Sequence, residues 1–338
     1  MPWGAVVGLN GGVWAVESED TGLEILVVMD PIGSIKPEKD SSFAMMLEAQ
    51  RRGWRVRYAE LASIWLRDGQ ACGYLTDVRV RDDPEDWFSL GDQTVAPLAE
   101  TDVILMRKDP PFDMEYIYAT YILERAEDGG ALVVNRPQSL RAANEKAFVS
   151  WFPECAVPSL ISRSIPELLG FIDEQGGAVV KPLDLMAGTS VFVTAPEDPN
   201  RRVLLETMSG NGSRYVMAQR YLSEVVESGD ARILLIDGQP VPHALVRFAP
   251  PGDHRANMSV GARTETRPLT TAEQRICELV GPVLHEMGLV FVGIDVIGGY
   301  LTEINVTSPT GIRELDRALG INVAAKLLDA FQSKVKRG

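Results

Sequence analysis

Cysteine and histidine are scarce in this chain, with three of each among 338 residues. Cys72, Cys155 and Cys277 are far apart and show none of the short spacings that hold a metal ion. An odd, sparse set also argues against a disulfide framework, so each cysteine is expected to be a small buried residue in a reducing cytoplasm. The histidines form no recognisable triad with a serine or cysteine, and the nucleophile pattern G-x-S-x-G does not occur.

Positive charge is also in deficit, because 33 lysines and arginines stand against 47 aspartates and glutamates, for a net charge of −14. Such a chain does not attract nucleic acid or anionic lipid through its overall field, so neither is an expected partner. No stretch holds the ~20 uncharged apolar residues that a membrane span needs. Residues 1–22 contain no lysine or arginine and do not resemble a signal peptide, so we expect an N-terminal extension.

Strand and helix patterns alternate in the first third of the chain. An apolar run over 23–30 predicts a buried strand, and a helix follows with Ser41 or Ser42 as its N-cap and Gly53 as its stop. The alternating residues 54–60 predict a second strand. The order strand–helix–strand indicates a parallel, open α/β domain. Further elements of that domain are expected as a strand over 102–109, a helix over 115–128 and a strand over 131–135.

A boundary is expected near 136–146, and two further regions follow it. The first is a smaller α/β segment with strands over 178–184, 190–194 and 215–222. The second opens with two strands joined around Asp237-Gly238, a dipeptide typical of hairpins. A polar stretch over 249–269 is too long and irregular for a plain turn. After it we expect a helix over 271–288, a hairpin over 290–309 and a helix near 311–333.

The hairpin expected over 290–309 is the most informative stretch, and the glycines at 298–299 mark its turn. Because strand side chains alternate, Glu303 and Asn305 lie on one face. A two-residue turn places Asp295 opposite Thr302, whereas a three-residue turn places Asp295 opposite Glu303. Only the second register gathers an oxygen-rich patch suited to Mg²⁺. A solvated polar face explains the same spacing about equally well.

Basic residues supply a second signal. Lys181 ends an apolar strand, where its charge must reach water or an anion, and Lys146 opens a helix-like stretch where anions are favoured. The small residues over 184–190 between them suit a phosphate-cradling loop, although a plain hairpin and two surface lysines remain the simpler interpretation. Arginines of the last third suit an anionic substrate or form scattered surface salt bridges. They are Arg232, Arg247, Arg255 and Arg263.

Several long segments, taken together, resemble the bacterial glutathione synthetases of the ATP-grasp superfamily. The match runs from about Leu23 to about Leu328. Its markers are MDPI, KDSSFAMMLEAQRRG, ILMRKDPPFD, YIYATYILERAE, VNRPQSLRAANEK, KPLD, MAQRYL and FVGIDVIGGYLTEINVTSPTGIRE. The resemblance implies an α/β chain with an ATP-grasp fold. Its expected parts are the extension 1–22, an N-terminal open α/β substrate domain at 23–144, a small central lid domain at 145–222 and a C-terminal α+β domain with the metal site at 223–338.

The resemblance also implies an activity, that of an ATP-dependent carboxylate–amine ligase. It would join γ-glutamylcysteine and glycine into glutathione, with ADP and phosphate as the other products, through an acyl phosphate. Such a reaction needs positioning and charge neutralisation rather than a covalent protein nucleophile, which agrees with the missing triad. The family further implies Mg²⁺ or Mn²⁺ with ATP, a cytoplasmic location, and a homo-oligomer, either a dimer or a tetramer.

Roles of individual residues follow from the same resemblance. ATP would be bound by Lys146, Lys181, Asp184, Gly188, Gln219, Arg220, Tyr221 and Leu222. The metal would be held by Asp295, Glu303 and Asn305. The catalytic arginines would be Arg232, Arg247, Arg255 and Arg263. Substrate would be bound by Asn257, Ser308 and Thr310, and residues 249–267 would form a flap that shields the intermediate from water.

Some positions depart from the family pattern. Leu185 and Ala187 stand where the family loop has glycine, Ala256 and Ala262 stand where the flap has glycine, and Gly311 stands where a cysteine is common. If those glycines need a positive φ, each β-carbon costs roughly a kcal/mol or more. Two alternatives therefore stay open: a ligase with another amine acceptor or acyl donor, and a catalytically impaired nucleotide-binding homologue.

Overall fold

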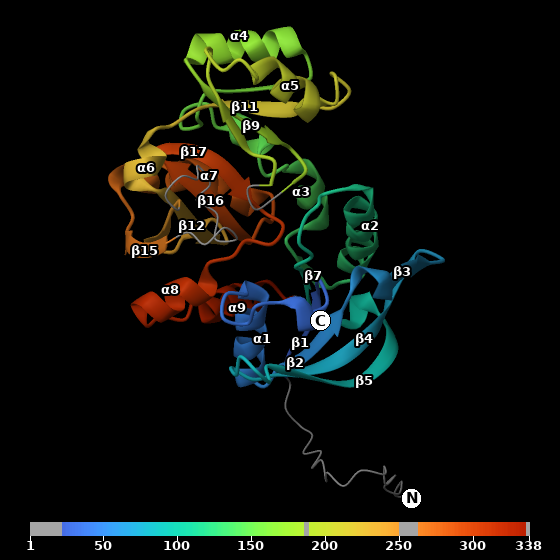
Figure 1. The fold of residues 1–338 in the computed structure, drawn as a ribbon. Helices are drawn as coiled ribbons and strands as arrows, with labels where there is room; N and C mark the ends of the chain where they lie inside the picture. The colour runs from blue at the N-terminus through green and yellow to red at the C-terminus, as the bar shows by residue number, and fades with distance from the viewer. Residues whose placement is uncertain (1–21, 186–188, 250–262, 336–338) are drawn as a thin grey trace, which may run out of the picture.

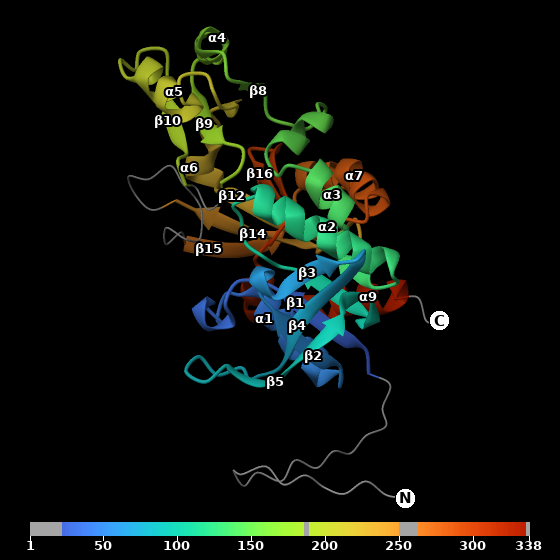
Figure 2. The same cartoon turned by 90° about the vertical axis from the view of Figure 1, so that its right-hand side faces the viewer.

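The computed structural model describes residues 22–185, 189–249 and 263–335. Within these residues the chain forms three β-sheets in succession, and helices pack on them (Figure 1). Figure 2 shows the second sheet at one end of the molecule and the first at the other, with the third between them. The mixed α/β architecture that the sequence predicts is present, whereas residues 1–21 of the expected extension lie outside the described residues.

The first sheet has the parallel centre expected of an open α/β domain. Its strands run in the order β3-β4-β2-β1-β6-β7, with β5 paired to β4. The parallel strands are β1 (Glu24–Val28), β2 (Arg55–Ala59), β6 (Val103–Met106) and β7 (Leu132–Val134). An antiparallel extension that the sequence analysis does not predict consists of β3 (Ile64–Arg67), β4 (Gln70–Val80) and β5 (Phe88–Pro97).

Two crossover helices cover opposite faces of this sheet, α1 (Ser41–Arg51) and α2 (Met114–Asp128). The apolar side chains of α1 pack in one buried cluster with Ile25 and Val27 of β1. Those of α2 pack in another cluster with Leu26 and Val28. This division follows from the alternation of side chains along β1, since successive residues face opposite sides of a sheet.

The start of α1 differs from the expectation. Its N-cap is Asp40, whose carboxylate accepts a hydrogen bond from Phe43 N at 2.6 Å. The prediction of a serine cap is therefore wrong: Ser41 and Ser42 lie inside the first turn, and a carboxylate is as good a cap as a hydroxyl. The predicted stop is confirmed, because Gly53 just beyond the helix adopts a φ of +78°, which glycine tolerates best.

The second sheet is small and fully antiparallel, in the order β10-β9-β11-β8. Its strands are β8 (Ser159–Ser162), β9 (Ala178–Pro182), β10 (Phe192–Thr194) and β11 (Val216–Arg220). Two helices absent from the sequence prediction cover it, α4 (Ile165–Gln175) and α5 (Arg201–Ser209). Leu168, Ile172 and Leu205 from these helices form its own buried cluster with Val180 and Ala218.

The third sheet runs in the order β15-β14-β12-β16-β17. Its strands are β12 (Asp230–Ile236), β13 (Gln239–Pro240, beside β12), β14 (His243–Phe248), β15 (Arg263–Pro268), β16 (Phe291–Ile297) and β17 (Tyr300–Asn305). α7 (Thr271–Glu286) follows β15. The stretch 249–269, expected to be more than a plain turn, contains β15, which pairs along β14 and satisfies its backbone there.

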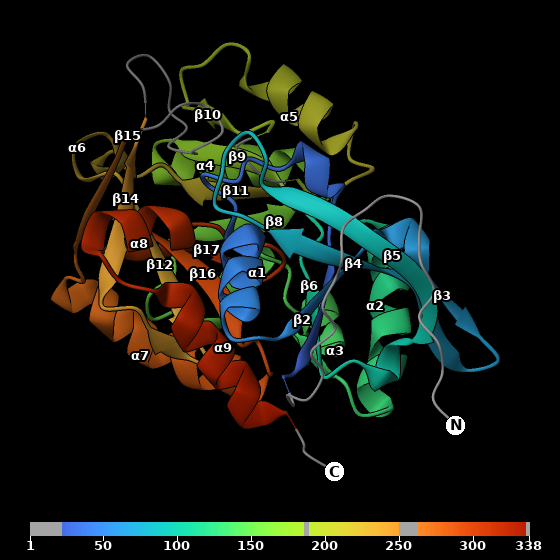
Figure 3. The same ribbon diagram turned by 90° about the horizontal axis from the view of Figure 1, so that it is seen from below.

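The expected C-terminal helix is two helices, α8 (Ile312–Leu319) and α9 (Val323–Lys334). Gly320 ends the first with a φ of +64°, and Asn322 caps the second by accepting from Ala325 N at 2.8 Å. α9 lies beside α1 (Figure 3), and its Leu327 and Phe331 share a buried cluster with Phe43 of α1. The last part of the chain thus completes the core of the first sheet.

The remaining short elements connect the sheets. They are η1 (Ile32–Ser34), η2 (Leu61–Ser63), η3 (Leu98–Glu100), α3 (Pro137–Ala142), η4 (Ala147–Trp151) and α6 (Glu224–Ser228). All three cysteines are free; Cys155 and Cys277 are buried as predicted, whereas the prediction is wrong for Cys72, which is partly exposed. No helix within the described ranges has the length and apolar character needed to cross a membrane.

Candidate active site

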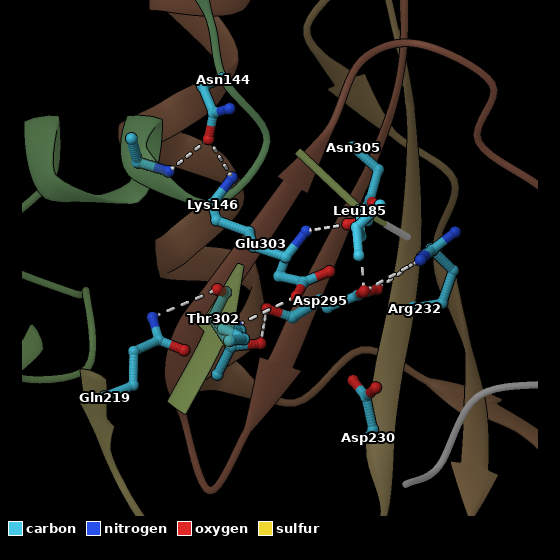
Figure 4. Close-up of polar contacts among 12 residues, drawn as sticks. Asn144, Lys146, Leu185, Gln219, Asp230, Arg232, Asp295, Thr302, Glu303 and Asn305 are labelled. Carbon is cyan, nitrogen blue, oxygen red and sulfur yellow. Dashed lines mark hydrogen bonds and ion pairs between the residues drawn. The ribbon is translucent and has the colours of Figure 1, made fainter. Parts of the chain in front are cut away.

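The hairpin of β16 and β17 brings the three predicted metal ligands together (Figure 4). Ile297 pairs with Tyr300, so the turn has two residues and the predicted three-residue turn is not formed. Asp295 nevertheless faces Glu303, because a bulge shifts the register between Asp295 and Val296. The register of a two-residue turn therefore holds beside the turn, and the register of a three-residue turn holds from Asp295 to Gly293. The paired strands β16 and β17 are called the ribbon below.

Thr302 is the extra residue of this bulge. Its Oγ1 donates to the backbone oxygen of Asp295 at 3.0 Å, which closes the gap in the backbone ladder. Asn305 pairs with Gly293 one step further and donates its Nδ2 to Asp295 Oδ2 at 3.2 Å. The bulge therefore decides that Glu303 and Asn305 both lie against Asp295.

Asp295 is held by two arginines from neighbouring strands. Arg232 on β12 lies directly opposite and binds both carboxylate oxygens, with Nε to Oδ1 at 2.5 Å and Nη2 to Oδ2 at 2.9 Å. Arg247 on β14 reaches Oδ1 at 3.0 Å. All three side chains are buried. Although burial alone raises the pKa of Asp295, the two guanidinium groups hold that pKa well below its usual range.

A fourth member of this group, Asp230, is absent from the sequence prediction. It accepts a hydrogen bond from Arg247 Nη2 at 2.5 Å. Burial raises the pKa of Asp230 to about 7, and the charge of Arg247 opposes that rise. The sequence carries one signal for Asp230: it precedes Arg232 by two positions on one strand, so both side chains share a face.

Two lysines approach the ribbon from the side of the second sheet. Lys181 on β9 is 5% exposed, and its Nζ lies 3.0 Å from Glu303 Oε1. Burial would raise the pKa of Glu303, but Lys181 and Lys146 together hold it below its usual value. Lys146 precedes the five-residue 3₁₀ helix η4, and its Nζ donates to the backbone oxygen of Leu185. The predicted lysines therefore face one carboxylate from two directions.

The side-chain atoms of the ribbon that remain available as metal ligands are oxygens. Glu303 Oε2 and Asn305 Oδ1 have no hydrogen-bond partner in the described parts of the chain. Both oxygens of Asp295 already accept from two donors each, which Arg232, Arg247 and Asn305 supply. No group of three histidines, cysteines, aspartates or glutamates suited to a metal ion occurs within 22–185, 189–249 and 263–335, so the third member of any metal set here is the amide of Asn305.

The end of β11 packs against the bulge. Gln219 is buried, and its Nε2 donates to the backbone oxygen of Thr302 at 3.4 Å. The guanidinium of Arg220 lies 4.8 Å from the ring centre of Tyr300. Beyond them, Leu222 is buried, and Tyr221 N donates to Gly177 O at 3.2 Å. The segment predicted to hold adenine thus adjoins the ribbon.

The connection between the first and second sheets also reaches the ribbon. Glu145 Oε1 accepts from Val306 N at 2.9 Å and from Thr307 N at 3.0 Å. Asn144 Oδ1 accepts from Lys146 N, and its Nδ2 donates to Leu183 O. The sequence prediction assigns neither residue, although both stand directly before Lys146 in the quoted NEK segment.

Other predicted residues lie apart from the cluster or beyond the described residues. Arg263 is exposed, pairs with Glu265 and lies over the ring of Phe248. Asp184 is also exposed. Ser308 and Thr310 follow β17, and Thr310 O accepts from Arg232 Nη1 at 3.5 Å. The calls that fall outside the described residues are Gly188, Arg255 and Asn257, together with Ala187, Ala256 and Ala262.

The fold places the chain among the ATP-grasp ligases. It superposes on the crystal structure of D-cycloserine synthetase DcsG with a TM-score of 0.64, at 17% identity, over 92% of this chain and 100% of that one. The ATP-grasp ligase PsnB, in complex with precursor peptide PsnA2 and AMPPNP, gives a TM-score of 0.60 at 16% identity over 95% and 100%. These neighbours confirm the predicted fold class.

Sequence comparison identifies the family within that class. The family models match the prokaryotic glutathione synthetase N-terminal domain at residues 23–141 and its ATP-grasp domain at residues 145–320. Glutathione synthetase from Pseudomonas putida is 51% identical over 92% of this chain and 98% of that protein. The Escherichia coli K12 protein is 47% identical over 93% and 99%. The chain belongs to the prokaryotic glutathione synthetase family, which confirms the ATP-dependent, glutathione-forming ligase activity that the resemblance implies.

Proposed function

We propose that the ribbon of β16 and β17 is the place where this ligase activates the cysteinyl carboxylate of γ-glutamylcysteine for attack by glycine. The observation that supports this most is the meeting of Glu303 and Asn305 with Lys181 across two sheets. Oxygen ligands and buried cations side by side are what a metal-bound triphosphate needs. Lys181 is buried and pairs with the partly exposed Glu303, and a buried ion pair is weak evidence of a purely stabilising role.

The residues of the ribbon fit a hard divalent cation. Glu303 Oε2 and Asn305 Oδ1 are free oxygens among the described residues, and Asp295 faces Glu303 directly. To ligate such a cation, Asp295 exchanges one of its present contacts, which are with Arg232, Arg247 and Asn305 Nδ2. We propose Mg²⁺, with Mn²⁺ as the substitute, held by these three side chains. When bound, the cation neutralises charge that develops on the transferred phosphoryl group.

Different residues of the site act in the two transfer steps. A carboxylate oxygen of γ-glutamylcysteine attacks the terminal phosphorus of ATP, and the bond from that phosphorus to ADP breaks. Lys146 and Lys181 hold the phosphates as the charge moves. The amine nitrogen of glycine next bonds the carbonyl carbon, the bond from that carbon to the phosphate oxygen breaks, and the nitrogen loses a proton. Arg232 stabilises the oxygen that becomes negative in this second step.

The network behind Arg232 orients it. Asp295 binds Arg232 in a bidentate manner, Arg247 on β14 also binds Asp295, and Asp230 on β12 binds Arg247. Guanidinium groups held in this way lose little entropy on binding a substrate. We further assign adenine contacts to the chain around Gln219. The other roles implied by the resemblance are retained as predictions for Arg220, Tyr221, Leu222, Asp184, Gly188, Asn257, Ser308, Thr310, Arg255 and Arg263.

Lys146 has to change partner during this reaction. Its Nζ donates to the backbone oxygen of Leu185, so a phosphate oxygen must replace that carbonyl. A charge-assisted bond to phosphate is stronger than one to a neutral carbonyl, so the exchange is favourable. Leu185 stands where the family loop has glycine. Because the observed contact uses only its backbone, the substitution leaves the bond to Lys146 possible.

The test is product formation with each component omitted in turn. With ATP, Mg²⁺, γ-glutamylcysteine and glycine, we expect glutathione by mass spectrometry and one ADP per peptide bond. ADP release without glycine at the full rate, or peptide formation with another amine at a higher kcat/KM than with glycine, would contradict the proposal. Glu303→Gln should abolish turnover. As a control, Glu286→Gln removes an exposed carboxylate at the end of α7 and should leave the rate unchanged.

Assembly and location are separate proposals. The family relationship supports a homo-oligomer, either a dimer or a tetramer, and a cytoplasmic enzyme. Light scattering coupled to size-exclusion chromatography measures the first directly, and a mass equal to one chain of 37.0 kDa would contradict it. Fractionation of the source cells measures the second.

A further inference from the structure

The first sheet contains a point at which its connections diverge. β1 and β6 are parallel neighbours. The chain leaves β1 through α1 toward β2 on one side, and leaves β6 through α2 toward β7 on the other. In open α/β sheets, ligands bind outside the carboxyl ends of the strands at such a point. The residues that follow these two strands are therefore candidates for a ligand site.

Arg107 directly follows β6 at this point and is only 5% exposed. Its Nε donates to Ser42 Oγ at 2.9 Å and its Nη2 to Pro309 O at 2.9 Å. The guanidinium lies 5.5 Å from the ring centre of Phe291. Within the described ranges Arg107 forms no ion pair, and its Nη1 has no hydrogen-bond partner. The charge of this buried side chain is therefore not matched by a contacting carboxylate.

Asp40, Asp109 and Glu145 lie near enough to act on the charge of Arg107, but none of them forms an ion pair with it in the described parts of the chain. Asp40 caps α1 through Phe43 N, and Glu145 accepts from the backbone after β17. Burial lowers the pKa of Arg107, which shows how strongly its surroundings disfavour an unpaired charge. A carboxylate brought by a ligand would supply the missing counter-ion.

A second buried arginine in the same sheet shows the usual arrangement. Arg57 on β2 is also 5% exposed, yet its Nη1 lies 3.3 Å from Glu24 and its Nε 3.3 Å from Asp77. The sheet can therefore pair a buried arginine with its own carboxylates. Arg107 differs in having none, and it stands at the divergence point rather than in the middle of a strand.

Arg107 is also linked to the proposed reaction centre by one short loop. Its Nη2 binds Pro309 O, and Arg232 Nη1 binds the next carbonyl, Thr310 O, at 3.5 Å. Consecutive carbonyls lie close together, so the two guanidinium groups are within roughly 12 Å of each other. Extended γ-glutamylcysteine separates its two carboxylate carbons by about 9 Å. One substrate molecule can therefore reach both arginines.

We propose that Arg107 binds the α-carboxylate of the γ-glutamyl residue and thereby selects the acyl donor. This inference rests on the proposed function, since it takes the cysteinyl carboxylate to lie at Arg232. The N-termini of α1 and α8 meet beside Arg107, where Ile312 N donates to Ser41 Oγ at 3.4 Å. Their partial positive charges add to the attraction for an anion. Arg107 is thus a specificity residue that contacts the end of the substrate remote from the chemistry.

The experiment compares two donors, γ-glutamylcysteine and 4-aminobutyryl-cysteine, which lacks only the α-carboxylate. For the natural chain we expect kcat/KM to fall by about 100-fold with the second donor, mostly through KM. In Arg107→Gln the natural donor should lose about the same factor, while the truncated donor should lose less than about threefold. The ratio between the donors should then approach one. Arg107→Lys should restore part of it, because a lysine keeps the charge but not the fork.

Arg57→Gln is the matched control, since it removes an equally buried arginine from the same sheet. It should lower stability but keep the full discrimination between the two donors. An unchanged donor ratio in Arg107→Gln, or no discrimination in the natural chain, would overturn the inference. If Arg107→Gln does not fold, the ratio in Arg107→Lys decides. If the natural chain ligates neither donor, the proposed function fails instead, and calorimetric binding of the two peptides still tests the role of Arg107.

Discussion

Buried arginines pair with carboxylates of other strands in both large sheets. In the first sheet Arg57 bonds with Glu24 and Asp77, whose side chains are 20% and 38% exposed. In the third sheet Arg247 bonds with Asp230 and Asp295, whose side chains are 14% and 5% exposed. The same kind of ion pair is therefore buried to different extents, because water reaches the carboxylates around Arg57 far more than those around Arg247.

Because the networks around Arg57 and Arg247 differ in burial, we infer that they also differ in function. The network around Arg57 is open to solvent, since its carboxylates share their charge with water and with Arg55, although Arg57 Nε is buried without a hydrogen-bond partner among the described residues. The network around Arg247 is sealed, and Asp230 Oδ1 and Arg247 Nε are buried without a hydrogen-bond partner among the described residues. A buried network of charges beside the free Oε2 of Glu303 supports the proposed binding of a metal and phosphate, because charges interact strongly where water is excluded.

The strongest test of this contrast is Asp295→Asn. Removing the charge leaves two buried guanidinium groups without their shared anion and takes away a proposed metal ligand. We expect kcat to fall by at least about 1,000-fold. The free energy of unfolding should fall by about 3 kcal/mol. Steady-state kinetics and thermal denaturation measure the two effects, and a stable, active variant would contradict the central role of this carboxylate.

Lys181→Met should separate binding of phosphate from support of the fold. We expect kcat/KM for ATP to fall by about 100-fold, because a buried point charge for the phosphates is lost. The melting temperature should change by only a few degrees. Lys334→Met is the control, since Lys334 pairs with Asp237 at 2.8 Å far from the ribbon. Equal kinetic losses in the two variants would remove Lys181 from the site.

Arg57→Met tests the other network. It leaves Glu24 and Asp77 without this partner, but both can reach water and Arg55. The free energy of unfolding should fall by about 2 kcal/mol, with kcat/KM for every substrate within about twofold of the natural value. A kinetic loss as large as that of the ribbon variants would show that the two networks are not functionally distinct.

Thr302→Val tests the β-bulge at which the two pairing registers of β16 and β17 meet. The variant keeps the shape of the side chain but loses its bond to Asp295 O. An unpaired buried carbonyl costs roughly 1 to 2 kcal/mol, so we expect about a tenfold loss of kcat with Mg²⁺. Thr120→Val removes a comparable bond to a backbone carbonyl in α2 and should leave kcat unchanged. A Thr302 variant with natural kcat would mean that the ribbon holds its register without this bond.

The smallest effect concerns a third network, which joins α1 to α9. Hydrogen bonds from Arg51, Arg52 and Asn322 lower the pKa of Glu48 to about 2. A carboxyl group with a lowered pKa stabilises the fold above its unfolded pKa and loses that contribution as the pH falls through its folded value. Because Arg51 is largely exposed, we expect only about 1 kcal/mol. Between pH 5 and pH 3 the natural chain should therefore lose more stability than Glu48→Gln, and parallel denaturation curves would contradict this.

Much of the fold could be predicted where periodicity is strong. The apolar runs that become β1, β6 and β16 and the helix patterns of α2 and α7 are local signals, and each forms the expected element. The extension β3–β5 was missed even though Asp68-Gly69 stands at its first turn, because β5 is exposed on both faces and lacks an apolar pattern. Likewise β15 has few apolar residues and forms through pairing with β14.

The candidate site shows the same division. Lys181, Glu303 and Asn305 could be selected from residue type and position, since a polar side chain at the end of an apolar strand is unusual. The spacing of Asp230 places it on the same face as Arg232, but its role, like that of Arg107, depends on which strands and loops lie beside it. The bulge at Thr302 is also invisible in the sequence, where both registers satisfy the alternation equally well.

The amino-acid sequence by itself determined the class of architecture, the family and the chemical nature of the ribbon, because these depend on local patterns and on residue types. Only the tertiary structure decided which charges are neutralised by neighbours and which are left for a ligand. The physical reason is that neutralisation requires contact within a few ångströms. Strand order and register set those contacts, and residues such as Arg107 and Pro309 meet although they lie far apart along the chain.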